Sequence, residues 1–150
     1  MQEADLGTYL AESISGYADD KVKAGSWSPE EALERSRGEF RRYLPEGVNS
    51  PGQHLYCIVD TGQDVTVGML WFGVMQDSPR PYAFLYELRI FEPFQDQGYG
   101  KRAMLALEAE VKAMGLDTIS LHVFGHNPAA RALYDRLGYE VTDLNMSKKL

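Results

Sequence analysis

The most informative stretch of the chain is Gln95-Asp96-Gln97-Gly98-Tyr99-Gly100-Lys101-Arg102, which lies between a predicted strand and a predicted amphipathic helix. Glycines in such a turn let the backbone bend tightly with its N–H groups exposed, and the start of a helix adds a partial positive charge. This combination favours a cradle for the oxygens of a pyrophosphate. A purely structural turn is the alternative, and this segment alone leaves the two open.

The same glycines also match the dinucleotide-binding pattern G-x-G-x-x-A, as Gly98-Tyr99-Gly100-Lys101-Arg102-Ala103. That pattern requires the glycines directly after the first parallel strand and an acidic residue about twenty positions later, at the end of the next strand. Here residues 91–97 separate the strand from the glycines, and Asp117 precedes the next predicted strand instead of ending it. A nucleotide-dependent oxidoreductase is therefore a distant alternative.

The composition is typical of one globular domain. The chain has 150 residues, 44% of them hydrophobic, and no repeat or flexible linker, so we expect a single domain over residues 1–150. Its 15 Lys and Arg against 22 Asp and Glu give a net charge of -7, the wrong sign for binding nucleic acid. Cys57 is the only cysteine and no Cys/His spacing resembles a zinc site, so we expect no metal.

The N-terminus carries no targeting pattern. It begins Met-Gln-Glu-Ala-Asp, without a basic n-region or an apolar h-region, and no apolar run in the chain is long enough to cross a bilayer. A lone cysteine agrees with a reducing compartment. We therefore expect a cytoplasmic protein with no membrane partner.

The spacing of apolar residues predicts two leading helices, a block of strands, and then alternating helices and strands. Ser28-Pro29 and Asn127-Pro128 are typical of helix starts, and Gly115 is typical of a helix end. The expected helices span residues 4–23, 29–43, 99–114 and 128–137, and the expected strands span residues 54–59, 65–75, 82–90, 118–124 and 139–150. The first three strands form the simplest antiparallel meander. The order α-α-β-β-β-α-β-α-β belongs to the α/β (α+β) class.

Two spaced motifs give the chain a resemblance to a known family. The motifs are Gln95-x-x-Gly98-x-Gly100, which fits the signature Q/R-x-x-G-x-G/A, and Asn127-x-x-Ala130-x-x-x-Tyr134-x-x-x-Gly138-Tyr139. With these motifs at the matching distance, the chain resembles the GNAT acyltransferase superfamily over residues 55–150, and within it an uncharacterised bacterial subgroup. The resemblance implies the GNAT fold, a mixed and mostly antiparallel central sheet flanked by helices.

The resemblance also implies acetyl-CoA as the acyl donor and indicates where it binds. The residues implied at the pyrophosphate turn are Gln95, Gln97, Gly98, Tyr99, Gly100 and Lys101. Leu88 and Ile90 offer backbone groups to the pantetheine arm, and an amide there stabilises the oxyanion formed from the thioester carbonyl. Asn127 reaches the pantetheine, with Ala130 and Arg131 near the other end of the cofactor.

Two side chains are expected to move protons. A primary amine such as that of lysine has a pKa of about 10.4 in water, so it must lose a proton before it attacks a thioester. Glu87, three residues before Ile90, is the candidate base, acting directly or through water. Tyr134 matches the family position whose phenol donates a proton to the departing CoA sulfur. Both have a structural alternative, Glu87 as a charged residue on a polar face and Tyr134 as a core residue, and Asn127 has one as an N-cap.

The acceptor side of the site is expected at the turn between the first two helices. Tyr17 and Trp27 can form an aromatic wall there, although Trp27 can equally pack the two helices together. The acidic surface favours a cationic amine, such as a polyamine, an aminoglycoside or a lysine side chain. The expected acceptor is therefore a small-molecule or protein amine.

The sequence thus predicts an acetyl-CoA-dependent N-acetyltransferase, and the alternative is a non-catalytic acyl-CoA-binding or sensing module. Two features depart from the family pattern. The usual strand before the first helix is missing, and only 12 residues follow Gly138, where the family commonly has a two-stranded hairpin. One side of the cleft is then open, or a second subunit completes it by pairing along the exposed edge of the sheet, which makes a homodimer a hypothesis.

Overall fold

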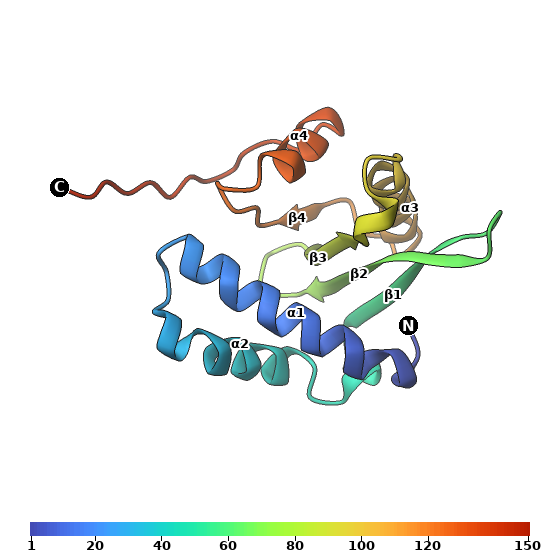
Figure 1. The fold of residues 1–150 in the computed structure, drawn as a ribbon. Coiled ribbons are helices and arrows are strands. Elements are labelled where there is room, and N and C mark those ends of the chain that lie inside the picture. The colour runs from blue at the N-terminus through green and yellow to red at the C-terminus, as the bar shows by residue number, and fades with distance from the viewer.

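The computed structural model describes residues 1–150 as four α-helices and four strands (Figure 1). The helices are α1 (Glu3–Lys23), α2 (Pro29–Tyr43), α3 (Tyr99–Ala113) and α4 (Pro128–Arg136), and the strands are β1 (Gln53–Asp60), β2 (Val65–Met75), β3 (Tyr82–Ile90) and β4 (Ile119–Leu121). None of the helices combines the length and the apolar composition that a bilayer span requires.

Helices cover both faces of the sheet (Figure 1), and β2 contributes side chains to the hydrophobic core on each face. Because side chains alternate along a strand, Met69 and Trp71 of β2 pack with α1 and α2, whereas Leu70 and Phe72 pack with α3 on the opposite face. The first core includes the almost fully buried Tyr9 of α1. The two cores therefore meet across one strand.

The sheet has the order β1-β2-β3-β4. β1, β2 and β3 form the expected antiparallel meander, and β4 runs parallel to β3. The parallel pairing covers only Ala83–Leu85 of β3 against β4, so beyond Leu85 the second edge of β3 has no strand beside it. The mixed, mostly antiparallel sheet flanked by helices is confirmed.

A bulge interrupts the pairing of β2 with β3. Trp71 lies opposite Glu87 and Phe72 lies opposite Leu85, so Tyr86 has no partner residue on β2. A bulge bends its strand and changes the direction of the side chains beside it. Here it lies just where β3 loses its contact with β4.

Two expectations are wrong in detail. The strand expected over residues 118–124 is the shorter β4, because β3 and β4 diverge after Leu121 and leave the following residues unpaired. The final strand expected over residues 139–150 does not form, because no strand lies beside this segment to accept its hydrogen bonds. Ser28 is the N-cap of α2 as expected, but its side chain makes no capping hydrogen bond.

Candidate active site

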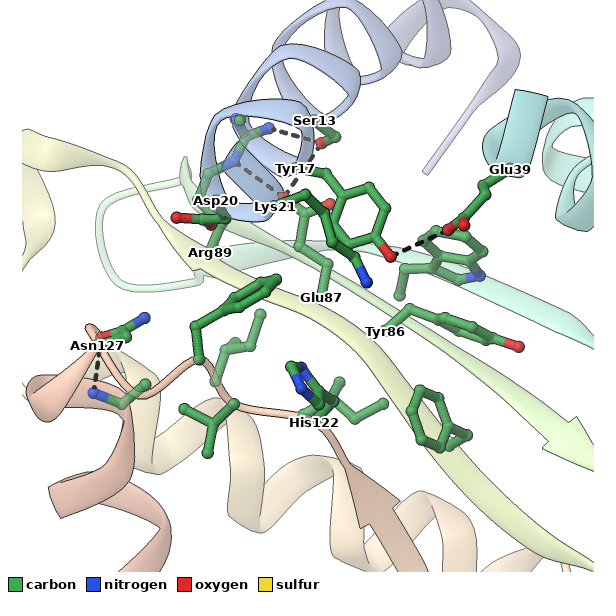
Figure 2. A pocket seen from close by; sticks show the side chains of 18 of the residues that line it. Ser13, Tyr17, Asp20, Lys21, Glu39, Tyr86, Glu87, Arg89, His122 and Asn127 are labelled. Atoms are coloured by element: carbon green, nitrogen blue, oxygen red, sulfur yellow. Dashed lines mark hydrogen bonds and ion pairs between the residues drawn. The ribbon is translucent and has the colours of Figure 1, made fainter. Parts of the chain in front are cut away.

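A cavity of about 570 Å³ lies between α1, α2, β3 and the segment that joins β4 to α4. Figure 2 shows its labelled side chains coming from all of these elements. Four carboxylates, two basic side chains and a set of aromatic rings line the cavity. They are Glu12, Asp20, Glu39, Glu87, Lys21, Arg89, Tyr17, Phe40, Tyr43, Trp71, Phe84, Tyr86, Phe124 and Tyr134.

The bulge in β3 brings two neighbouring residues into this cavity. The Tyr86 ring stacks on Trp71 with 4.3 Å between ring centroids, and burial raises the pKa of Tyr86 to about 12. Glu87 is directed toward α1, where its carboxylate binds two hydroxyl groups. In an undisturbed strand, successive side chains point to opposite faces, so the bulge explains why both residues line one cavity.

Both oxygens of Glu87 accept a hydrogen bond from α1 (Figure 2). The Tyr9 hydroxyl donates to Oε2 at 2.8 Å, and the Ser13 hydroxyl donates to Oε1 at 3.1 Å. Burial, and then the nearby Glu87 charge, raise the pKa of Tyr9, which keeps its phenol protonated and able to donate. The carboxylate of Glu87 is therefore fixed in place before any ligand binds.

Arg89 adds a positive charge beside this carboxylate. Its Nε lies 3.6 Å from Oε1 of Glu87, and its Nη1 pairs with Glu12 Oε2 at 2.9 Å. Its Nη2 also donates to the Ser13 hydroxyl at 3.4 Å. Arg89 thus neutralises part of the negative charge that Glu12 and Glu87 bring to the cavity.

Tyr9, Ser13 and Arg89 are site residues that the sequence did not lead us to expect. A signal for Ser13 was present, because this polar residue lies four positions after Tyr9, on the face of α1 that otherwise carries apolar side chains. Ser13 is 5% exposed, and a hydroxyl buried so deeply in a helix face needs a partner from another element. Nothing in the sequence indicated that this partner is Glu87.

The backbone of β3 presents unpaired groups next to Glu87. The N–H of Phe91 donates to Val67 of β2 at 2.9 Å. Because backbone groups alternate in direction along an antiparallel strand, the N–H groups of Leu88 and Ile90 point the other way, toward the edge that β4 leaves open. These are the two residues expected to offer backbone groups to a pantetheine arm.

The turn before α3 leaves the first amides of that helix uncapped. Gly98 is the N-cap residue with a φ of 80°, a conformation that favours glycine, and it provides no side-chain cap. The N–H groups of Tyr99, Gly100 and Lys101 precede the first intrahelical donor, Arg102, which bonds to Gly98 at 3.1 Å. The geometry of an anion cradle is therefore present at the expected residues.

Three side chains in this turn form hydrogen bonds within the protein. The Gln95 amide donates to the carbonyl oxygen of Ile90 at 3.0 Å, and the Gln97 amide donates to that of Pro93 at 3.0 Å. The Tyr99 hydroxyl donates to Asp60 at the turn between β1 and β2. Because its hydroxyl is bonded to Asp60, Tyr99 can offer a ligand at the cradle only its backbone N–H.

α4 carries the remaining expected cofactor residues. Asn127 is its N-cap and accepts a hydrogen bond from the Ala130 N–H at 3.1 Å, so the capping role predicted for Asn127 is confirmed (Figure 2). Asn127, Ala130 and Tyr134 line the cavity, whereas Arg131 is exposed and lies outside the lining. Burial raises the pKa of Tyr134, so its phenol keeps its proton at neutral pH.

The end of the cavity at α1 and α2 is aromatic and acidic. The Tyr17 hydroxyl donates to Glu39 at 3.0 Å, and burial followed by this bond raises the pKa of Tyr17. Trp27 packs edge-on against Tyr17 at 5.4 Å but does not line the cavity. Trp27 therefore packs against the helix, which is the structural alternative to a cavity wall. Lys21 lies over both rings.

The two histidines near the cavity pair with other groups. His126 lies 2.9 Å from Asp20 and stacks on Phe124, which also contacts the His122 ring. Burial, and then the charge of Lys21, lower the pKa of His122. No three His, Cys, Asp or Glu side chains gather in a geometry suited to a metal ion.

Comparison with known proteins identifies the family. The profile of the acetyltransferase (GNAT) family matches residues 19–139. The chain belongs to the GNAT acetyltransferase family. It is 41% identical over 150 residues to YycN, an uncharacterised N-acetyltransferase of Bacillus subtilis, covering 100% of this chain and 96% of YycN. The crystal structure of YycN superposes with a TM-score of 0.93 over 100% of this chain and 95% of that one.

A further relative has a named acceptor. The chain is 39% identical over 92 residues to the alanine N-acetyltransferase of ribosomal protein bS18 from Haemophilus ducreyi, covering 61% of each protein.

Of the residues that the GNAT resemblance implied, six line the cavity: Tyr17, Glu87, Leu88, Asn127, Ala130 and Tyr134. A Cβ added at Gly100 would lie 3.4 Å from the Leu133 side chain, so the cradle lies against α4, whose Ala130 and Tyr134 line the cavity.

Proposed function

We propose that this GNAT protein transfers the acetyl group of acetyl-CoA directly to a primary amine. The observation that carries the proposal is that one cavity is lined by a fixed carboxylate, Glu87, a protonated phenol, Tyr134, and the open-edged segment of β3 at Leu88. These are a base, an acid and an oxyanion donor, the three groups that acyl transfer to an amine requires.

The residues present fit acetyl-CoA. The uncapped amides of Tyr99, Gly100 and Lys101 can hold its pyrophosphate, and the N–H groups of Leu88 and Ile90 at the open edge of β3 can bind its amide-rich arm. When bound, acetyl-CoA supplies an acetyl group activated as a thioester. The N–H of Leu88 can then donate to the oxygen on which negative charge develops.

Glu87 and Tyr134 divide the proton transfers between them. A protonated amine is drawn to the Glu87 carboxylate, which Tyr9 and Ser13 hold in one position, and it gives up its proton to that carboxylate directly or through water. Tyr134 keeps its phenol protonated because it is buried, and it can return a proton to the sulfur that leaves. The tetrahedral adduct loses a second proton from its nitrogen, which can replace the one that Tyr134 gives to the sulfur, and the proton held by Glu87 then passes to solvent.

The lining favours an acceptor with a positive charge and an apolar body. Four carboxylates against Lys21 and Arg89 leave the cavity negative, and the rings of Tyr17, Trp71 and Tyr86 offer apolar and cation–π contacts. A polyamine, an aminoglycoside and a lysine side chain all meet this description. The alanine acceptor of the bS18 enzyme adds a protein N-terminal amine to the candidates.

One observation favours a second candidate function, a non-catalytic acyl-CoA-binding module. Both oxygens of Glu87 already accept hydrogen bonds, which is also how a purely structural carboxylate is bound. The two functions differ in turnover. In the deciding experiment, acetyl-CoA is incubated with the protein and a panel of amines, and released thiol is measured, with the N-acetylated form of each amine as its control. Thiol release with free amines alone supports the enzyme, and release with none of them supports the binding module.

A further inference from the structure

Lys21, near the end of α1, places a primary amine of the protein itself inside the cavity. It lines the cavity, and Figure 2 shows its side chain extending in front of the Tyr17 ring into the space between α1 and His122. The backbone of Lys21 is held in place, because its carbonyl oxygen accepts hydrogen bonds from the N–H groups of Ser26 at 2.9 Å and Trp27 at 3.3 Å. The amine is therefore carried on a flexible methylene stem that starts from a defined point.

The ammonium group of Lys21 has no anionic partner. Arg89, the other basic side chain of the lining, pairs with Glu12 at 2.9 Å. Nζ of Lys21 forms no ion pair or hydrogen bond, and it contacts the faces of the Tyr17 and Trp27 rings, with each ring centroid 5.3 Å away. Cation–π contacts are weak where water has access, so these rings leave the amine free to move within the cavity.

Lys21 faces the part of the cavity where β3 and β4 diverge. Burial, and then the charge of Lys21, lower the pKa of His122, so the ammonium group lies close enough to the His122 ring to act on it. His122 directly follows β4, at the point where the pairing with β3 ends. Glu87 and Leu88, the proposed base and oxyanion donor, line the same cavity. The amine of Lys21 therefore lies in the space proposed for the amine of an acceptor.

We propose that Lys21 is an internal acceptor, acetylated on Nζ by the acetyl-CoA that its own chain binds. This inference rests on the proposed function, because it uses the same acetyl donor and the same cavity. The amine and the bound donor belong to one complex, so the transfer is intramolecular. A reaction within one complex gains a high effective concentration over the reaction with an amine from solution.

The transfer to Lys21 follows the same steps as the transfer to any primary amine. The ammonium group gives one proton to Glu87, directly or through water, and the free amine attacks the carbonyl carbon of the thioester. A C–N bond forms and the C–S bond breaks. The sulfur leaves as the thiol with the proton of Tyr134, and the second proton of the nitrogen replaces it. The products are acetyl-lysine, CoA and one proton, which passes from Glu87 to solvent. The acetylated side chain is uncharged, so Arg89 is then the one Lys or Arg side chain that faces the four carboxylates of the cavity.

The test is incubation of the full-length protein with acetyl-CoA and no added amine, followed by measurement of intact mass and peptide mapping. We expect one acetyl group per chain, on Lys21, added at least about tenfold faster than to any lysine of the same protein unfolded in urea, which gives the uncatalysed rate. The rate constant should not depend on protein concentration, because each chain modifies itself. Lys21→Arg keeps the positive charge and should stay unmodified. The control Lys23→Arg changes an exposed lysine of the same helix and should still be acetylated on Lys21.

Three outcomes overturn the proposal. Lys21 stays unmodified, exposed lysines react as fast as Lys21, or the rate constant rises with protein concentration, which means that one chain modifies another. The amine panel, run in parallel on the same protein, separates this inference from the proposed function. Thiol release with the panel but no acetyl group on Lys21 overturns the inference alone, whereas the absence of both overturns the inference and counts against the proposed function. An acetylated Lys21 without thiol release from the panel supports both, since Lys21 is itself a primary amine.

Discussion

Replacing Glu87 with Gln tests the proposed base with little change in shape. The Glu87 side chain is 22% exposed, and Gln keeps its volume and one of its two acceptor oxygens. General bases contribute about 10²–10⁴-fold to rate, so we expect kcat/KM at pH 7 to fall by this factor. This loss corresponds to about 3–5 kcal/mol of transition-state stabilisation.

The stability of Glu87→Gln should change far less than its rate. One hydroxyl, of Tyr9 or Ser13, exchanges a charged acceptor for an amide, which costs about 1–2 kcal/mol. For a chain of this size the corresponding drop in Tm is about 2–8 °C. The affinity for acetyl-CoA should stay within about twofold, because the side chain of Glu87 is not among the expected cofactor contacts.

The assay is thiol release with the best acceptor from the amine panel, followed from pH 7 to 9. Without the base, the rate should rise about tenfold per pH unit, because the fraction of free amine rises by that factor below its pKa. The control is Glu110→Gln, since Glu110 accepts a hydrogen bond from Tyr56 outside the cavity. A Glu87→Gln enzyme that retains a third or more of wild-type kcat/KM at pH 7 would refute the role of Glu87.

Three further predictions follow from the same geometry. Tyr134→Phe should lower kcat about 10²-fold with unchanged acetyl-CoA affinity, measured by thiol release and calorimetry; an unchanged kcat removes Tyr134 from the chemistry. Gly68→Ala should lower the free energy of unfolding, measured with urea, by about 3 kcal/mol, because the new Cβ would fall 2.3 Å from the Arg89 carbonyl oxygen. The control Gly7→Ala, whose Cβ would meet nothing within 4 Å, should raise it slightly. Equal effects of the two substitutions would contradict the packing. Because the pKa of His122 is lowered in the folded protein, the imidazole takes up its proton at a higher pH in the unfolded chain, so stability should fall as the pH drops below about 6.5. The measurement is the free energy of unfolding in urea at pH 7.5 and 5.5, and the difference between the two should be smaller in His122→Gln than in the wild type.

Patterns between neighbouring residues of the sequence predicted most of the fold. The spacing of apolar residues predicted α1 and α2, and strand alternation predicted the meander with its bounds within one residue. Gly115 ends α3 with a φ of 79°, as its position suggested. These features depend on neighbours in the chain, which a single sequence contains.

Contacts between distant residues account for what the sequence did not reveal. The bulge at Tyr86 depends on how β2 and β3 pair, and the hydrogen bonds that hold Glu87 join residues 78 and 74 positions apart. The final strand was predicted from its alternation, but a strand also needs an adjacent edge, which no local pattern specifies. The same limit applies to Trp27, whose sequence position fits both a cavity wall and a contact between helices.

The central claim is that the cradle at α3 and the open edge of β3 bind acetyl-CoA. Calorimetric titration of the purified protein with acetyl-CoA, CoA and NADH in parallel tests it most directly. We predict micromolar binding of acetyl-CoA and CoA and no binding of NADH. The absence of binding by either CoA species would contradict the account, because the turn from Gln95 to Lys101 would then be purely structural.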